Sequence, residues 1–170
     1  ERGAIKVDDY LRTTAENVWA IGDVKGGPQF TYISLDDFRI IFDQLYGKGE
    51  RKVSDRKLVP YSVFTTPALS RVGLNEVEAK NKGIEYKLFK LAATSIPKAK
   101  VIGNTRGMYK ILVNPDTKEI LGATIYGEES YEVINLIALA MKAKLPYTML
   151  RNQIYTHPTM SEALNDVLKG

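Results

Sequence analysis

Apolar residues change their spacing along the chain, and this pattern separates two regions. The short apolar run Val18–Ile21 ends in a glycine and an aspartate, which is typical of a buried strand that enters a loop. The segment Thr31–Tyr46 is predicted to form a helix, because apolar residues recur there at helical spacing, namely Ile33, Leu35, Phe38, Ile41, Phe42 and Leu45. Gly47–Lys52 contains glycine and several charges, and it offers the best domain boundary in the sequence.

The region beyond this boundary has a mixed α and β pattern. Strands are predicted at residues 59–64, 86–93, 108–113 and 120–126. The last two strands form a predicted hairpin, since Asn114–Thr117 between them has explicit turn chemistry. Helices are predicted over residues 75–82 and 130–143, and from residue 159 or 160 to 169. Consecutive strands covered by helices indicate an α+β domain that can fold alone, whereas the first strand and helix need a parent sheet.

Composition and charge exclude several classes of function. The 24 basic and 20 acidic residues give a net charge of +4, and the lysines are scattered, so we predict no nucleic-acid interface. No apolar run approaches the ~20 residues that a membrane span needs, so we expect no membrane association. The absence of cysteine excludes disulfides, cysteine zinc sites and thiol catalysis within these residues, and it is consistent with a cytoplasmic protein. We predict no metal site, and the lack of an initiator methionine suggests a piece of a longer chain.

His157 is the only histidine in the chain, and a lone histidine is more often structural than catalytic. Its surroundings favour a second interpretation. Pro158 disfavours a helical conformation at His157, and a predicted helix that carries Glu162 begins directly afterwards. That carboxylate can reach one imidazole nitrogen and fix the tautomer, which leaves the other nitrogen to exchange protons with a thiol. The alternative is a capping box, because Thr159–Glu162 matches its pattern and the spacing alone favours it.

Asp23 is a second candidate site residue. Spacing alone favours an ordinary turn aspartate after the run Ala20–Gly22. The functional alternative places its carboxylate at the carboxyl end of a strand, where open α/β sheets bind ligands, and where it can accept hydrogen bonds from sugar-like hydroxyls. The amides that open the following helix, at Gln29, Phe30 and Thr31, would then face an electron-rich group, since helix N-termini favour negative charge.

Several segments together resemble one known family. Thr13–Asp23 resembles the second FAD-binding signature of the pyridine nucleotide–disulfide oxidoreductases, and His157–Glu162 resembles the active-site signature near their C-terminus. Between them, Val63–Pro67 and Val72–Glu76 resemble the opening of the family's dimerisation domain. The order and separation of these segments also fit, and the resemblance covers essentially the whole chain.

The resemblance implies a fold, cofactors and partners. Residues 1–52 would be the C-terminal remnant of an FAD-binding α/β domain, with its last strand, its last helix and a linker. Residues 53–170 would be the dimerisation domain, an α+β fold with an antiparallel sheet and helices. The parent would be a homodimer that contains FAD, takes electrons from NADH or NADPH, and passes them to a small-molecule or disulfide acceptor.

The same resemblance implies roles for the candidate residues. Asp23 would hold a ribityl hydroxyl of FAD, and the amides at Gln29, Phe30 and Thr31 would approach the pyrimidine edge of the flavin. His157 would be the acid/base group and would be oriented by Glu162, the two acting at the flavin and redox dithiol of the partner subunit. Because the chain has no cysteine, that dithiol must lie outside this segment.

The branch of the family is indicated by one further segment. Gly26–Arg39 is similar to the mercuric-reductase-like branch that includes the reactive-chlorine-resistance flavoproteins. Strict mercuric reductases carry a C-terminal cysteine pair, which this chain lacks, so mercury is disfavoured as a substrate. The alternative function is a free-standing dimerisation or interaction module without redox activity, and a nucleic-acid-binding module is a more distant third.

Overall fold

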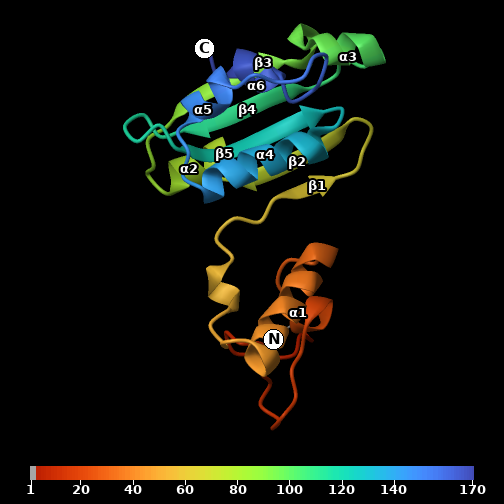
Figure 1. The fold of residues 1–170 in the computed structure, drawn as a ribbon, viewed down its shortest axis with the longest axis vertical. Helices are drawn as coiled ribbons and strands as arrows, with labels where there is room; N and C mark the ends of the chain where they lie inside the picture. The colour runs from red at the N-terminus through yellow and green to blue at the C-terminus, as the bar shows by residue number, and fades with distance from the viewer. Residues whose placement is uncertain (1–2) are drawn as a thin grey trace. The chain divides into compact units, whose positions relative to one another are not determined.

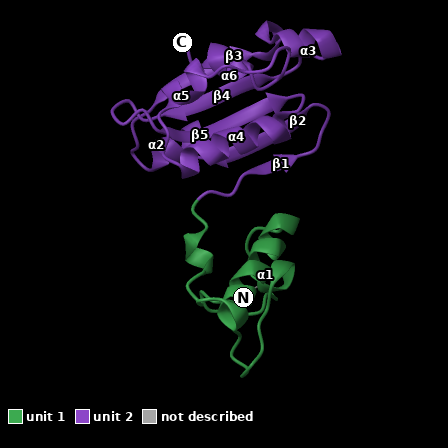
Figure 2. Cartoon of the chain, in the orientation of Figure 1, with its two compact units in different colours: residues 1–57 green, residues 58–170 purple. Residues whose placement is uncertain are grey.

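The computed structural model describes residues 3–170, and the chain divides into two compact units, Glu1–Lys57 and Leu58–Gly170 (Figure 2). Residues 53–57 therefore belong to the first unit, whereas the sequence pattern placed the boundary after residue 52. The reason is a set of contacts that the pattern does not contain. The amide of Ser54 donates to Asp9 Oδ1 at 2.9 Å, and the guanidinium of Arg56 pairs with carboxylates on the preceding helix.

The first unit contains one long helix, α1 (Thr31–Tyr46), with the bounds that the apolar spacing predicts. A 3-10 turn, η1 (Gly22–Lys25), precedes the helix, and a second one, η2 (Val53–Asp55), follows it. The buried face of α1 consists of Ile33, Asp37 and Ile40, which recur at helical spacing. Its other large apolar side chains are exposed within this chain, for example Phe38 and Phe42 at 52% each.

The strand predicted over residues 18–21 is wrong. The structure has only an isolated antiparallel bridge there, between Arg12 and Trp19, and Val18 is 49% exposed. A strand needs neighbouring strands to satisfy its backbone groups, and the described part of this unit offers only that one bridge. Ala20 is buried, but its two apolar neighbours are not, so the run lacks the burial expected of a core strand.

The second unit is built on a five-stranded antiparallel sheet (Figure 1). Its spatial order is β1-β2-β5-β4-β3, so β5 lies at the centre. The strands are β1 (Tyr61–Val63), β2 (Ala68–Gly73), β3 (Lys87–Ala92), β4 (Met108–Val113) and β5 (Ile120–Gly127). The predicted hairpin of β4 and β5 is confirmed. Sequence analysis missed β2, because its inward side chains are mostly small: Ala68, Ser70 and Val72 carry little hydrophobic signal.

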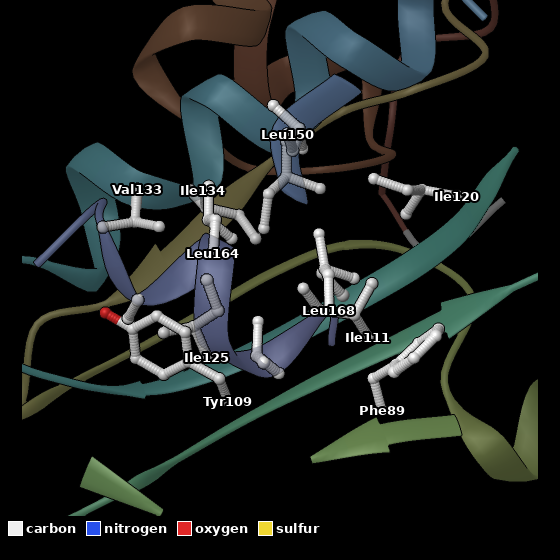
Figure 3. Packing of buried hydrophobic residues seen from close by; sticks show 14 of the residues in the cluster. Phe89, Tyr109, Ile111, Ile120, Ile125, Val133, Ile134, Leu150, Leu164 and Leu168 are labelled. Carbon is white, nitrogen blue, oxygen red and sulfur yellow. The ribbon is translucent and has the colours of Figure 1, made fainter. Parts of the chain in front are cut away.

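Helices cover the sheet and close the core (Figures 1 and 3). They are α2 (Glu76–Asn81), α3 (Pro97–Ile102), α4 (Ser130–Lys142), α5 (Tyr147–Asn152) and α6 (Ala163–Val167). The long helix α4 packs on β2 and β5, and the short helix α6 packs on β3 and β4. Both helices contribute apolar side chains to one core cluster, which also contains the inward side chains Tyr109, Ile111 and Ile125 of the sheet. The C-terminal segment is therefore anchored in the core of the second unit.

Candidate acid/base and cofactor sites

The structure brings His157 and Glu162 together. Nδ1 of His157 lies 2.8 Å from Oε2 of Glu162. A carboxylate oxygen accepts, so Nδ1 is the donor and Nε2 is the nitrogen left for proton exchange. The imidazole side chain is 71% exposed and the carboxylate side chain is only 14% exposed. The imidazole of His157 is therefore exposed at the surface of the second unit, and the carboxylate that orients it is largely buried.

Only one of the two hydrogen bonds of a capping box is found at Thr159 and Glu162. The hydroxyl of Thr159 accepts a hydrogen bond from the amide of Glu162 at 3.3 Å, as a capping residue does. The carboxylate of Glu162 turns to His157 instead of forming the reciprocal bond, and α6 begins only at Ala163. The last helix is therefore shorter than its predicted range. The second carboxylate oxygen, Oε1, is buried and has no hydrogen-bond partner among residues 3–170.

The backbone before His157 is fixed by Tyr155. Its hydroxyl donates to the carbonyl of Leu150 at 3.1 Å, and its ring packs against the core of the second unit. Burial raises the pKa of Tyr155 to about 12, because the charged phenolate is poorly solvated there. Tyr155 therefore ties the exposed segment that leads to His157 to the end of α5.

Alkaline titration should reveal Tyr155 as a late-titrating tyrosine. Because its folded-state pKa lies above the ordinary 10.0, its contribution to stability is complete below pH 10 and is lost as the pH rises through about 12. We expect the tyrosinate absorbance of the Tyr155→Phe chain to lose one late step. The control Tyr46→Phe, at a tyrosine that is 77% exposed, should keep that step. An unchanged late titration in Tyr155→Phe would contradict the assignment.

The candidate cofactor residues lie in the first unit. Asp23 is exposed and sits in η1, which contacts α1. Gln29, Phe30 and Thr31 are exposed at the start of that helix, and Phe30 is its N-cap residue. The turn that carries Asp23 and the positive end of the α1 dipole are therefore parts of one small unit.

Asp37 organises this turn, and sequence analysis missed it. Its fully buried carboxylate accepts a hydrogen bond from the amide of Gly22 at 2.8 Å, and it forms salt bridges with Lys25 (3.5 Å) and with Arg56. Gly22 itself has a φ of +67°, and a Cβ there would lie 2.8 Å from the hydroxyl oxygen of Ser34. The apolar spacing of the helix gave no sign of this role, because the contacts of Asp37 with Gly22 and Arg56 join residues that are distant in the sequence.

Two further kinds of site were sought in the described part of the chain. Residues 3–170 contain no group of three or more His, Cys, Asp or Glu side chains that could hold a metal ion. In the same residues, every helix is too short or too polar to cross a membrane.

Sequence comparison places this geometry in a known family. The profile described as "Pyridine nucleotide-disulphide oxidoreductase, dimerisation domain" matches residues 59–168, which is nearly the whole second unit. The chain belongs to the pyridine nucleotide-disulphide oxidoreductase family. A second profile, described as "Pyridine nucleotide-disulphide oxidoreductase", matches residues 1–37. The predicted dimerisation domain, an antiparallel sheet with helices, is thereby confirmed.

Individual members of the family are similar over almost the whole chain. It is 54% identical over 167 residues to the probable pyridine nucleotide-disulfide oxidoreductase RclA of Escherichia coli (strain K12), an alignment that covers 98% of this chain and 38% of RclA. A mercuric reductase of Staphylococcus aureus is 35% identical over 164 residues, which are 96% of this chain and 30% of that enzyme. The solved structure described as HOCl-induced flavoprotein disulfide reductase RclA from Escherichia coli has a TM-score of 0.97 at 53% identity, and it covers 99% of this chain and 39% of that one.

These family members also define how much of a whole oxidoreductase the chain represents. It spans about two fifths of the length of RclA and less of the mercuric reductase. The similarity to RclA and to a mercuric reductase agrees with the branch of the family that the segment Gly26–Arg39 indicated. The roles predicted for His157, Glu162 and Asp23 stay predictions at this point, because the comparisons concern the family and the fold.

Proposed function

We propose that the chain is the C-terminal part of an FAD-dependent oxidoreductase that receives electrons from NADH or NADPH. In this proposal it contributes a homodimer interface and an acid/base pair for a redox dithiol. The observation that carries the proposal is the 2.8 Å hydrogen bond between His157 and Glu162 within a dimerisation domain of this family. RclA, which is 53% identical in its solved form, is described as a flavoprotein disulfide reductase, and this description supports the choice of chemistry.

The homodimer is supported by exposed apolar side chains on the second unit. Leu139 on α4 is 66% exposed, Met149 on α5 is 55% exposed, and Ile154 just before His157 is 96% exposed. Exposed large apolar side chains mark contact regions where they form one patch, and in this proposal these three lie in the interface with a second copy. A second copy that covers these side chains would also bring His157 close to the partner subunit.

In the proposed reaction, the pair moves one proton in each half of the cycle. Nε2 of His157 accepts a proton when a thiol of the dithiol becomes a thiolate, and it returns that proton to the leaving thiolate or to the reduced acceptor. Glu162 keeps Nδ1 protonated and stabilises the imidazolium between these two steps. The imidazole of His157 is exposed, as a group that acts at another subunit must be. The carboxylate of Glu162 is largely buried, which keeps it fixed and able to orient the imidazole.

The first unit has residues that fit part of an FAD site. FAD, when bound, supplies the two-electron acceptor between the nicotinamide and the dithiol. The carboxylate of Asp23 would accept a hydrogen bond from a sugar hydroxyl. The hydrogen bond between Gly22 and Asp37 holds the turn that carries Asp23 in place. The amides at Gln29, Phe30 and Thr31 would stabilise negative charge on a ring edge, since they open the 16-residue helix α1.

The proposal is tested by the visible absorption spectrum of the full-length protein before and after anaerobic addition of NADH or NADPH. We expect flavin bands near ~450 nm that bleach on reduction. A long-wavelength charge-transfer band would further support a dithiol next to the flavin. A colourless full-length protein that takes up no added FAD would contradict the enzyme proposal and leave a dimerisation module without redox function.

A further inference from the structure

Asn165, on α6, makes an unusual set of contacts with the end of α5. Its side-chain amide donates to the carbonyl oxygens of Arg151 at 2.8 Å, Gln153 at 3.0 Å and Leu150 at 3.3 Å. An amide group has only two hydrogens, so the three carbonyls share them. The last carbonyls of a helix have no partner within the helix, and Asn165 supplies one for α5.

The same residue is also bonded to Glu162. The backbone amide of Asn165 donates to the carbonyl of Glu162 at 3.0 Å, within the first turn of α6. Its side chain holds residues 150–153, which lead directly into the segment that ends at His157. One residue therefore connects the two stretches of backbone whose side chains meet in the His157–Glu162 hydrogen bond.

We propose that Asn165 is a positioning residue that sets the separation of His157 and Glu162. A carboxylate at this place would face three carbonyl oxygens without a hydrogen to donate, and an alkyl side chain would leave them without a partner. In either case the end of α5 should move away from α6, and Nδ1 of His157 should lose its fixed distance to the carboxylate. The effect of Asn165 on turnover rests on the proposed function of the pair, whereas its effect on the hydrogen bond does not.

The single histidine makes the hydrogen bond directly observable in the chain by NMR. A ring N–H that donates to a carboxylate gives a proton signal far downfield that exchanges slowly with water. We expect this signal for Nδ1 of His157, and we expect Asn165→Asp and Asn165→Leu to increase its exchange rate at least tenfold or to remove it. The control is Asp166→Asn, at the adjacent exposed residue that pairs with Lys169, and it should leave the signal in place.

Two outcomes decide the proposal. Loss of the downfield signal in both Asn165 variants, with backbone amide spectra that remain dispersed, supports the positioning role. An unchanged signal in both folded variants overturns it. In the full-length protein, Asn165→Asp should lower kcat about 10²-fold at an unchanged KM for the nicotinamide, because a misplacement of 1 Å costs on that order. If the signal is lost while both Asn165→Asp and His157→Gln turn over normally, the proposed function fails and the positioning role stands.

Discussion

Replacing His157 with glutamine in the full-length protein should slow dithiol-dependent turnover by about 10²–10⁴-fold, the range that a positioned acid/base group contributes. Glutamine keeps a polar side chain of similar length that can still donate to Glu162, but it cannot take up a proton. Reduction of the flavin by NADH or NADPH should remain near the wild-type rate, since that step does not require the pair. Steady-state kcat and stopped-flow records of the two half-reactions would separate these effects.

The matched variants test whether the two residues act as one unit. Glu162→Gln removes the carboxylate that orients the imidazole, and we expect a smaller loss of about 10²-fold, as for a misoriented catalytic group. The double variant should be no slower than His157→Gln alone, because residues that act together are not additive. Asp166→Asn, at an exposed position on α6, serves as the control. Wild-type turnover in His157→Gln would rule out the acid/base role.

Neutralising Asp37 should have the largest effect on stability in the first unit. Asp37→Asn keeps the shape of the side chain and an acceptor for Gly22, but it removes the buried countercharge of Lys25 and leaves Arg56 paired with Asp36 alone. Removal of one partner of a buried ion pair costs about 3–5 kcal/mol. We therefore expect the first unit to unfold at a markedly lower urea concentration, and η1 with Asp23 to lose its fixed position.

The unique tryptophan provides a local probe for this prediction. Trp19 lies in the first unit, so its fluorescence in a urea titration reports on that unit. Asp36→Asn is the matched control, because it removes the same charge one residue earlier on α1, from a carboxylate that is 15% exposed and not fully buried. The control should be clearly less destabilising. Equal midpoints for Asp37→Asn and the wild-type chain would show that the buried network contributes nothing to the unit.

Structural features that depend on residues close together in the sequence could be predicted from the sequence. The helix α2, the turn between β4 and β5, and the bounds of α1 follow from spacing and capping rules that involve only a few residues. The pairing of His157 with Glu162 belongs to the same class. His157, Pro158 and Glu162 lie within six residues, so the possibility of this pairing can be recognised from neighbouring residues.

Residues that act across long stretches of sequence could not be found in this way. Asn165 reaches the end of α5, and Asp37 pairs with Arg56, which the sequence had placed in the dimerisation domain. The strand β2 was missed for a related reason, since its small inward side chains become recognisable only when β5 pairs with it.

The sequence by itself therefore determined the fold class, the family resemblance, the long helix of the first unit and the identity of the candidate acid/base pair. The tertiary structure alone decided which groups hold these parts in place and where the first unit ends. It also decided that Val18–Ile21 forms no strand in this chain. The physical reason is that hydrogen bonds between distant segments depend on the packing of whole elements, whereas caps, turns and helix faces depend on neighbouring residues alone.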